Sequence, residues 1–246
     1  MFSTIPIGNY RRGIEIRYEN EDRFGPKYHR KNQKKFGPKW YYYDKKISYK
    51  YNMDGFRAPE FSTVDWANSV VVLGDSFVVG MGNAIEDIFT THLQTLLGLP
   101  VINLGVSGSA IDRSCWNSVI LHDNFPHPKA IVQLWTGTHR YTEYDPESPE
   151  KHGGKRLINY QPATRHWCYR HEWQYRSMFY VQTDRALWKD KTIYYEATWQ
   201  HDTAKELAVD HIAQIDDGRD LHHWGYKTHL MAAEFIATKL KKQGLK

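Results

Sequence analysis

Four short, almost continuously apolar segments constrain the fold of this 246-residue chain most strongly. They are rich in β-branched residues and read SVVVL (69–73), PVINL (100–104), KAIVQLW (129–135) and KTIYYEA (191–197). Strands that are buried on both faces have this composition, whereas half-exposed strands alternate polar and apolar residues. The four segments therefore predict a parallel sheet that helices cover on both sides.

Amphipathic segments between and after these strands supply the expected helices. They span 86–98, 111–125 and 225–242, and the last of them ends in lysines that complement the helix dipole. Strands that alternate with helices predict a doubly wound α/β fold. Residues 141–190 interrupt the alternation as an insertion, which begins as a loop and continues as a helix over 171–188. We expect this insertion to hang over the sheet edge where ligands bind.

The first sixty residues have a different composition. Aromatic and charged residues alternate in KWYYYDKKISYKYN (39–52), a period-two pattern that favours short strands or hairpins over helix. We therefore expect a β-rich, aromatic and basic extension over 1–60, packed on a main domain over 61–246. The net charge of +5 and basic runs such as KYHRKNQKK (27–35) permit nucleic-acid binding, although a solvated basic face is the favoured interpretation.

Cysteine usage and the N-terminal sequence bear on the cellular setting. The two cysteines, Cys115 and Cys168, do not make a disulfide framework. The first twenty residues lack the layout of a signal peptide, and no apolar run approaches membrane-spanning length. The sequence thus predicts a cytoplasmic protein without a membrane span, and a virion protein assembled in a cytosol would have the same features.

Ser76 is the first candidate for chemistry. It follows the first apolar strand in VVVLGDSFVVGMG (70–82), where the carboxyl end of a parallel strand opens into the binding crevice. Backbone N–H groups at the start of the next segment favour negative charge there. The local sequence leaves two interpretations open for Ser76, a helix cap and a catalytic nucleophile.

Two further segments could complete a site around Ser76. In NLGVSGS (103–109), Gly105 and Gly108 let the backbone turn sharply, and a glycine N–H could donate to an oxyanion, although an ordinary strand-to-helix turn has the same composition. Near the C-terminus, Asp220 and His223 are three residues apart and can face the same way. A carboxylate can then hold one imidazole nitrogen and leave the other to accept a serine proton.

The order and spacing of these three segments resemble the GDSL/SGNH hydrolases. The resemblance covers about 68–140 and 216–240, and leaves the first sixty residues and the insertion outside. It implies a flavodoxin-like, three-layer α/β/α fold with a central parallel sheet. It also implies hydrolysis of esters, often of acyl groups on sugars or lipids, with no metal and no cofactor.

The resemblance also assigns roles to individual residues. Ser76 matches the nucleophile of the family, Gly108 an oxyanion donor, and Asp220 and His223 the remaining members of a catalytic triad. The adjacent His222 competes with His223 as the base. His223 is preferred because its offset from Asp220 and the Trp-Gly that follows it match the family pattern.

One block departs from the family pattern. The third block normally reads Gly-x-Asn-Asp, and its asparagine side chain donates to the oxyanion, whereas this chain has TGTHR (136–140). His139 falls nearest the expected place, and Thr136 and Thr138 are close by. A neutral histidine can donate one hydrogen bond, so we predict that His139 substitutes for the asparagine.

The sequence therefore predicts a serine esterase that cleaves a carboxylic ester through an acyl-enzyme. Short acyl groups are expected because no strongly apolar lid is visible, and O-acetyl groups on a carbohydrate are one such substrate. The alternative is a weak or inactive SGNH-fold module that binds a glycan, nucleic acid or protein. The spacing of His166, Cys168 and His171 does not point convincingly to a metal site, and packing is the preferred interpretation.

Overall fold

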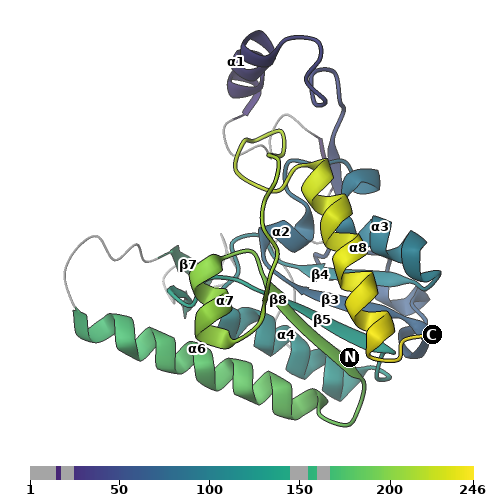
Figure 1. Cartoon of the computed structure of the whole chain (residues 1–246), viewed down its shortest axis with the longest axis vertical. Coiled ribbons are helices and arrows are strands. Elements are labelled where there is room, and N and C mark those ends of the chain that lie inside the picture. The colour runs from purple at the N-terminus through teal and green to yellow at the C-terminus, as the bar shows by residue number, and fades with distance from the viewer. Residues whose placement is uncertain (1–14, 18–24, 145–154, 160–166) are drawn as a thin grey trace.

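The computed structural model describes residues 15–17, 25–144, 155–159 and 167–246. Its centre is a five-stranded parallel sheet with the strand order β4-β3-β5-β8-β9 (Figure 1). This order is that of flavodoxin-like folds, in which the chain changes direction beside the first strand. The strands are β3 (Val70–Gly74), β4 (Val101–Gly105), β5 (Ala130–Trp135), β8 (Ile193–Thr198) and β9 (Asp210–His211).

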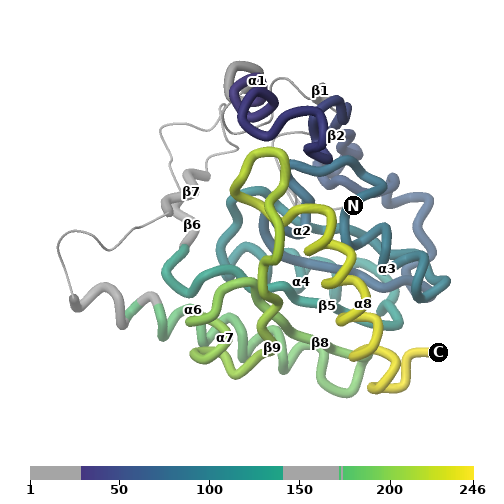
Figure 2. Tube along the Cα trace, turned by 45° about the horizontal axis from the view of Figure 1, so that its top comes forward, coloured from purple at the N-terminus to yellow at the C-terminus, as the bar shows by residue number. Residues whose placement is uncertain are grey.

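Helices cover both faces of the sheet (Figures 1 and 2). Alternate residues of β3 face the two layers: Val70 and Val72 belong to one buried cluster, and Val71 and Leu73 to the other. The predicted three-layer α/β/α fold is therefore confirmed. The first layer contains α3 (Phe89–Leu97) and α8 (Tyr226–Lys242), and the second contains α4 (Ile111–Asn124) and α6 (Trp167–Trp188).

Each predicted strand and helix of the main domain is present, with ends shifted by a few residues. The segment 86–98 divides into a 3-10 turn, η4 (Ile85–Asp87), and helix α3. Several short elements were not predicted, since none is long enough to show a hydrophobic period. Among them are β9, α2 (Ser76–Val79) and α7 (His201–Leu207).

The N-terminal extension contains both strand and helix. Strand β1 (Glu15–Arg17) pairs antiparallel with β2 (Ser48–Lys50), as the period-two pattern suggested. The preference for strands over helix is wrong for α1 (Gly25–Phe36). This segment is rich in lysine, arginine and glutamine, which are good helix formers, and it carries a proline near its start, where proline is tolerated. Two 3-10 turns follow, η2 (Phe61–Thr63) and η3 (Trp66–Asn68).

The extension packs against the start of the main domain. One buried cluster joins aromatic side chains of the extension to residues of α2 and of the turn that follows it. Figure 2 shows the described part of α1 together with β2 at one end of the molecule. The members of the cluster are Tyr42, Ile47, Tyr49, Tyr51, Val79, Met81 and Ala84.

The insertion is only partly described. The prediction of a loop after residue 140 is wrong where β6 (Arg140–Tyr144) and β7 (Lys155–Asn159) pair antiparallel, and helix α6 follows as expected. His166 lies outside the described residues, as do the side chains of Cys168 and His171. Within the described ranges, no three histidine, cysteine or acidic side chains could together hold a metal ion. No described helix is long and apolar enough to cross a membrane.

Candidate active site

Ser76 begins α2 directly after β3, at the carboxyl edge of the sheet. Asp75 caps this short helix, because its Oδ1 accepts a hydrogen bond from the backbone N–H of Phe77 at 3.0 Å. Gly74 has a φ of +156°, and a Cβ at this position would lie 2.6 Å from the carbonyl oxygen of Leu134. The tight strand-to-helix turn therefore holds Ser76 in one place at the sheet edge.

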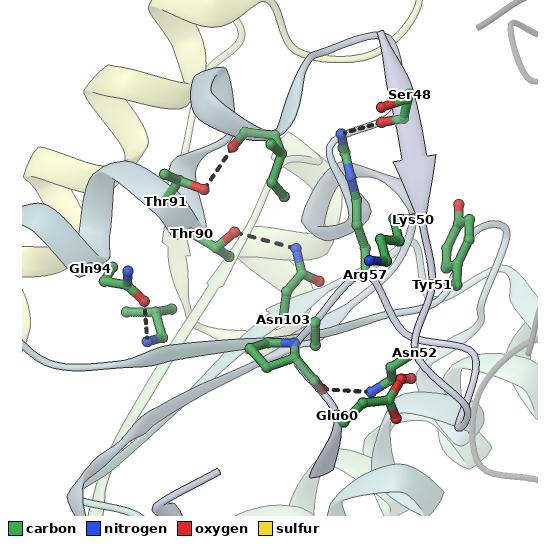
Figure 3. Close-up of a pocket in the computed structure, with 14 residues that line it drawn as sticks. Ser48, Lys50, Tyr51, Asn52, Arg57, Glu60, Thr90, Thr91, Gln94 and Asn103 are labelled. Atoms are coloured by element: carbon green, nitrogen blue, oxygen red, sulfur yellow. Dashed lines mark hydrogen bonds between the residues drawn. The ribbon is translucent and has the colours of Figure 1, made fainter. Parts of the chain in front are cut away.

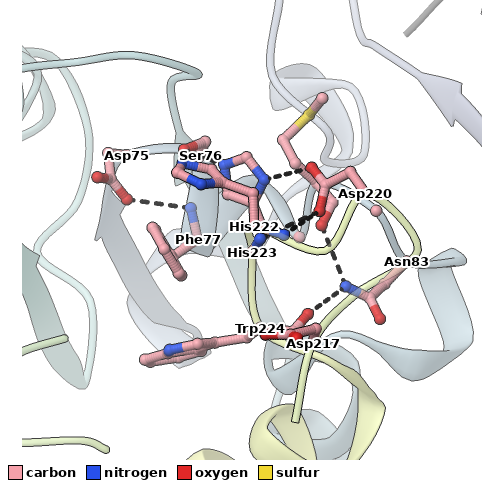
Figure 4. Close-up of polar contacts among 12 residues, drawn as sticks. Asp75, Ser76, Phe77, Asn83, Asp217, Asp220, His222, His223 and Trp224 are labelled. Atoms are coloured by element: carbon pink, nitrogen blue, oxygen red, sulfur yellow. Dashed lines mark hydrogen bonds and ion pairs between the residues drawn. The ribbon is translucent and has the colours of Figure 1, made fainter. Parts of the chain in front are cut away.

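Three side chains from two distant segments form a hydrogen-bonded series at this edge (Figure 4). The Nε2 of His223 lies 2.8 Å from the Oγ of Ser76, and its Nδ1 lies 2.6 Å from Oδ2 of Asp220. A carboxylate can only accept, so the proton of a neutral His223 ring resides on Nδ1 and Nε2 accepts the serine hydroxyl proton. The structure thus brings together the three residues that the sequence predicted as a triad.

The ring of His223, rather than that of His222, reaches Ser76. His222 is exposed, and its backbone N–H donates to Oδ1 of Asp220 at 3.1 Å. The backbone N–H of His223 donates to the same oxygen at 3.1 Å. The preference for His223 over its neighbour therefore agrees with the geometry.

Asp220 is held as a carboxylate. Burial alone would raise its pKa, but hydrogen bonds from the ring and backbone of His223 and from the backbone of His222 lower the pKa to about 2. Asp220 is 2% exposed, so these contacts replace the water that would otherwise solvate its charge. The group is consequently ionised throughout the neutral and mildly acidic range.

The loop that carries Asp220 and His223 is closed on itself. The backbone N–H of Gly218 donates to the carbonyl oxygen of His223 at 2.7 Å. At the end of the loop, Trp224 is completely buried, and Asp216 caps helix α8 by accepting from the backbone N–H of Thr228 at 2.7 Å. The sequence around the Asp-x-x-His motif thus fixes the loop between a buried anchor and a helix start.

The turn after α2 supports this loop from the other side. The backbone N–H of Arg219 donates to the carbonyl oxygen of Gly82 at 3.1 Å, and Nδ2 of Asn83 donates to that of Trp224 at 2.7 Å. A Cβ on Gly82 would lie 3.1 Å from Oδ1 of Asp220, and Gly82 has a φ of +79°. The close approach of the backbone to the carboxylate therefore depends on a glycine here.

The N-terminal extension holds the same turn in place. The hydroxyl of Tyr49 accepts from the backbone N–H of Gly82 at 2.8 Å, and the hydroxyl of Tyr42 donates to Oδ1 of Asn83 at 2.7 Å. The buried guanidinium of Arg57 donates to the carbonyl oxygen of Asn83 at 3.1 Å and to two carbonyl oxygens at the end of α2. The extension thus contacts the turn at Gly82 and Asn83, and this turn contacts the loop that carries Asp220 and His223. The sequence did not reveal this connection.

Gly108 lies in the turn after β4, beside the segment that carries Ser76. It has a φ of +71°, which favours glycine. Its neighbours Val106 and Ser109 both donate to the carbonyl oxygen of Gly74, through the Val106 backbone at 2.9 Å and the Ser109 hydroxyl at 3.2 Å. The turn after β4 is therefore joined to the turn after β3, next to Ser76. The role of Gly108 as an oxyanion donor stays a prediction.

The turn after β5 carries the departure from the family pattern. His139 is exposed, and its ring covers Gly137, where a Cβ would lie 2.4 Å from the ring carbon Cε1. The hydroxyl of Thr138 donates to Glu206, whereas the buried hydroxyl of Thr136 has no hydrogen-bond partner in the described structure. The role of His139 as an oxyanion donor also stays a prediction.

Arg140 is a neighbour of the candidate nucleophile that sequence reasoning missed. Its Nη1 lies 3.0 Å from Oδ2 of Asp75, the residue before Ser76, and Nε1 of Trp199 donates to the same oxygen at 3.3 Å. Two signals could have revealed it. Asp75 follows a buried strand and requires a positive partner there, and Arg140 stands where the third block of the family has an aspartate.

A separate pocket of about 480 Å³ lies between the extension and the β4 edge of the sheet (Figure 3). Its polar lining is largely engaged in internal contacts: Nδ2 of Asn103 donates to the carbonyl oxygen of Val78 at 2.6 Å, and Oε1 of Gln94 accepts from the backbone of Val101 at 3.2 Å. Ser76 does not line this pocket. The pocket is therefore distinct from the candidate active site.

No family model and no curated protein matches the chain. Among solved structures, it is similar to the acetyl xylan esterase Est2A from the rumen bacterium Butyrivibrio proteoclasticus. The two chains are 11% identical over 74% of this chain and 65% of the esterase, with a TM-score of 0.51.

Two further solved structures are more distant. A lipolytic protein of the G-D-S-L family from Desulfitobacterium hafniense DCB-2 is 11% identical over 70% of this chain and 98% of its own, with a TM-score of 0.43. A family two carbohydrate esterase from Clostridium thermocellum is 12% identical over 72% and 64%, with a TM-score of 0.48. The chain thus shares the α/β/α fold of an esterase, in agreement with the GDSL/SGNH resemblance of its sequence.

Proposed function

We propose that the chain is a serine ester hydrolase of the GDSL/SGNH type. The observation that carries this proposal is the series Ser76–His223–Asp220, with contacts of 2.8 and 2.6 Å between residues up to 147 positions apart. A helix cap would not require a histidine on the serine hydroxyl, nor a buried carboxylate behind that histidine. The arrangement has the three roles that nucleophilic catalysis by serine needs.

In the first half of the reaction, Ser76 Oγ attacks the ester carbonyl carbon while Nε2 of His223 takes the hydroxyl proton. Asp220 keeps the ring oriented through Nδ1 and stabilises the imidazolium. The negative charge moves to the carbonyl oxygen, where the backbone N–H groups of Ser76 and Gly108 donate, with His139 as a third proposed donor. The protonated His223 then gives its proton to the leaving alcohol, and an acyl-enzyme remains.

In the second half, water replaces the alcohol. Nε2 of His223 accepts a proton from the water as its oxygen attacks the acyl carbon, and a second tetrahedral intermediate forms. Collapse of this intermediate breaks the bond to Ser76 Oγ, which recovers its proton from His223. The products are the carboxylic acid and the alcohol, and the reaction needs no cofactor.

The proposed substrate is an ester of a short acyl group, with O-acetyl groups on carbohydrate as the leading example. The fold shared with an enzyme named as an acetyl xylan esterase supports this choice. A series of p-nitrophenyl esters from acetate to octanoate tests it, with kcat/KM expected to be highest for acetate. A maximum at octanoate would overturn the preference for short chains and leave the proposed hydrolase class intact.

The decisive variant is Ser76→Ala. Hydrolysis of p-nitrophenyl acetate should fall by roughly 10⁴-fold or more, because the variant removes the nucleophile and leaves only binding and oxyanion contacts. Ser62→Ala is the matched control, since Ser62 is exposed in the 3-10 turn η2. Circular dichroism and thermal unfolding should show that both variants are folded. Full activity in Ser76→Ala would refute the assignment.

A fluorophosphonate probe separates an enzyme from a binding module with the same fold. The probe reacts with a serine that a neighbouring base activates, so the parent chain should be labelled at Ser76 and the Ser76→Ala variant should not. Labelling at Ser76 without hydrolysis of simple esters would indicate a more specialised ester substrate. Failure of the folded parent to label would favour the binding module.

A further inference from the structure

A buried carboxylate stands directly beside the candidate nucleophile. Asp75 is completely buried, and its two oxygens have different partners. Oδ1 accepts from the backbone N–H of Phe77 at 3.0 Å, whereas Oδ2 faces the guanidinium of Arg140 at 3.0 Å and the indole N–H of Trp199 at 3.3 Å. One oxygen thus shapes the helix that begins at Ser76, and the other binds two side chains from distant segments.

The negative charge of Asp75 is unfavourable for the proposed reaction. During attack by Ser76, negative charge develops on the substrate oxygen, and the Asp75 carboxylate belongs to the residue directly before Ser76. Like charges repel strongly where burial excludes water, because the effective dielectric constant is low. A positive group that pairs with Asp75 removes most of this repulsion, and Arg140 is the group in that position.

Aromatic contacts fix the guanidinium in place. The guanidinium carbon of Arg140 lies 5.5 Å from the centre of the Trp199 ring, and that ring stacks on Phe77 with centres 4.2 Å apart. Phe77 is in turn 5.0 Å from the ring of His223. The Arg140 side chain is only 14% exposed, so its charge is held beside the site rather than spread into solvent.

The Nε of Arg140 supports a role for the charge itself. This atom is buried and has no hydrogen-bond partner within the described ranges. A buried donor without a partner is destabilising, and a neutral side chain of similar length would avoid that penalty. Among the described residues, the guanidinium is therefore kept beside Asp75 although its Nε is unpaired.

We propose that Arg140 is a positioning residue that neutralises Asp75 and so permits the oxyanion to form at Ser76. This inference rests on the proposed ester hydrolase function. Asp75 is retained because it caps the helix that presents Ser76, and Arg140 offsets the charge that this cap introduces. Asp75 lies in the turn after β3 and Arg140 at the start of β6, and the two residues act as one unit.

A double-mutant cycle tests the proposal with p-nitrophenyl acetate as the substrate. Arg140→Met should lower kcat by roughly 100-fold with little change in KM, because the repulsion acts on charge that exists only in the transition state. The Asp75→Asn replacement retains a good helix cap and removes the charge. Once Asp75 has been replaced, the same Arg140→Met change should cost less than tenfold. Arg140→Lys should retain more activity than Arg140→Met.

Each alternative has its own outcome. If Arg140→Met costs as much with Asn at position 75 as with Asp, Arg140 contacts the substrate itself, and the proposal is overturned. Activity of Arg140→Met within threefold of the parent also overturns it. Thermal unfolding of every variant, with Arg30→Met on the exposed face of α1 as a control, separates misfolding from charge effects.

If Arg140→Met does not fold, the double variant decides, since it contains no unpaired buried charge. Its kcat should lie within tenfold of the kcat of Asp75→Asn, and a larger loss counts against the proposal. A parent chain that neither hydrolyses esters nor reacts with the fluorophosphonate probe would refute the proposed function instead. The two failures are therefore distinguishable.

Discussion

The two sides of the candidate active site are built in different ways. On one side, the loop with Asp220 and His223 is joined to the turn at Gly82 and Asn83, which the N-terminal extension holds through Tyr42, Tyr49 and Arg57. These are hydrogen bonds to backbone atoms and neutral side chains. On the other side, the turn after β5 meets the nucleophile segment through one buried ion pair, Arg140 with Asp75.

The difference follows from what each side must hold. The base side needs accurate orientation of a neutral imidazole, which many short hydrogen bonds provide. In the proposed mechanism, the oxyanion side must tolerate developing negative charge, so its electrostatic balance matters as much as its geometry. The base side also keeps the family-like residues Asp220 and His223, whereas the turn after β5 departs from the family pattern at His139 and Arg140.

Asp220→Asn breaks the base side and should have the largest effect. An amide in place of the carboxylate favours the wrong tautomer of His223, which in serine proteases lowers kcat by about 10⁴-fold. The wild-type carboxylate, with its pKa lowered to about 2, is ionised above that pH, so titration of Asp220 should not limit activity between pH 5 and pH 8. Hydrolysis of p-nitrophenyl acetate by the parent and by Asp220→Asn, measured from pH 5 to pH 8, checks both expectations.

His222→Gln is the matched control for Asp220→Asn. The side chain of His222 is exposed, and the replacement preserves the backbone N–H that donates to Asp220. Its activity should stay within a few-fold of the parent. A large loss in His222→Gln together with a small loss in His223→Gln would reverse the assignment of the base.

The main features of this fold were predictable because their signals are local. The apolar runs of β3 and β5 and the three-residue offset between Asp220 and His223 can be read within one window of sequence. Helix α1 was missed because the aromatic alternation of 39–52 was extended to a neighbouring segment of different composition. Short-range patterns thus predicted the sheet, whereas the choice of Ser76, Asp220 and His223 depended on the order of distant segments that resembles the GDSL/SGNH hydrolases. Neither signal predicted the structure of the extension.

The missed contacts of the site join distant segments. Arg140 and Asp75 are 65 residues apart, and Tyr49 and Gly82 are 33 apart. The sequence spacing of neither pair predicts a contact, because the packed sheet sets the turn geometry that brings the two residues of each pair together. The requirement that a buried charge be paired and the place of Arg140 in the third block of the family pattern were the signals that pointed toward it.

His139→Ala probes the oxyanion side at the position where the family pattern has asparagine. If His139 is the third donor, kcat should fall by about 100- to 1000-fold, the usual loss for one oxyanion donor. Exposure of His139 makes this substitution compatible with folding. His201→Ala, at the start of α7, is a control with an exposed histidine. A loss of only a few-fold in His139→Ala would leave the backbone N–H groups and the Arg140–Asp75 pair as the remaining features of this side.

Tyr49→Phe tests the connection between the extension and the base side, and its effect should be the smallest. The variant keeps the ring below the Arg57 guanidinium, whose carbon lies 4.6 Å from the ring centre, but it leaves the N–H of Gly82 unpaired. An unsatisfied buried donor costs about 1–3 kcal/mol of stability, so the melting temperature should fall. The turn beside Asp220 should loosen, and kcat should fall by a few-fold with KM unchanged.

Tyr43→Phe serves as the control in the same extension, because Tyr43 is not part of the cluster that reaches Gly82. A fall in melting temperature without any change in kcat would show that Tyr49 stabilises the extension but does not position the base. A fall in kcat with an unchanged melting temperature would show the reverse. Several hydrogen bonds besides that of Tyr49 hold the turn at Gly82, whereas Arg140 pairs directly with the buried Asp75. Tyr49→Phe should therefore cost far less activity than Arg140→Met.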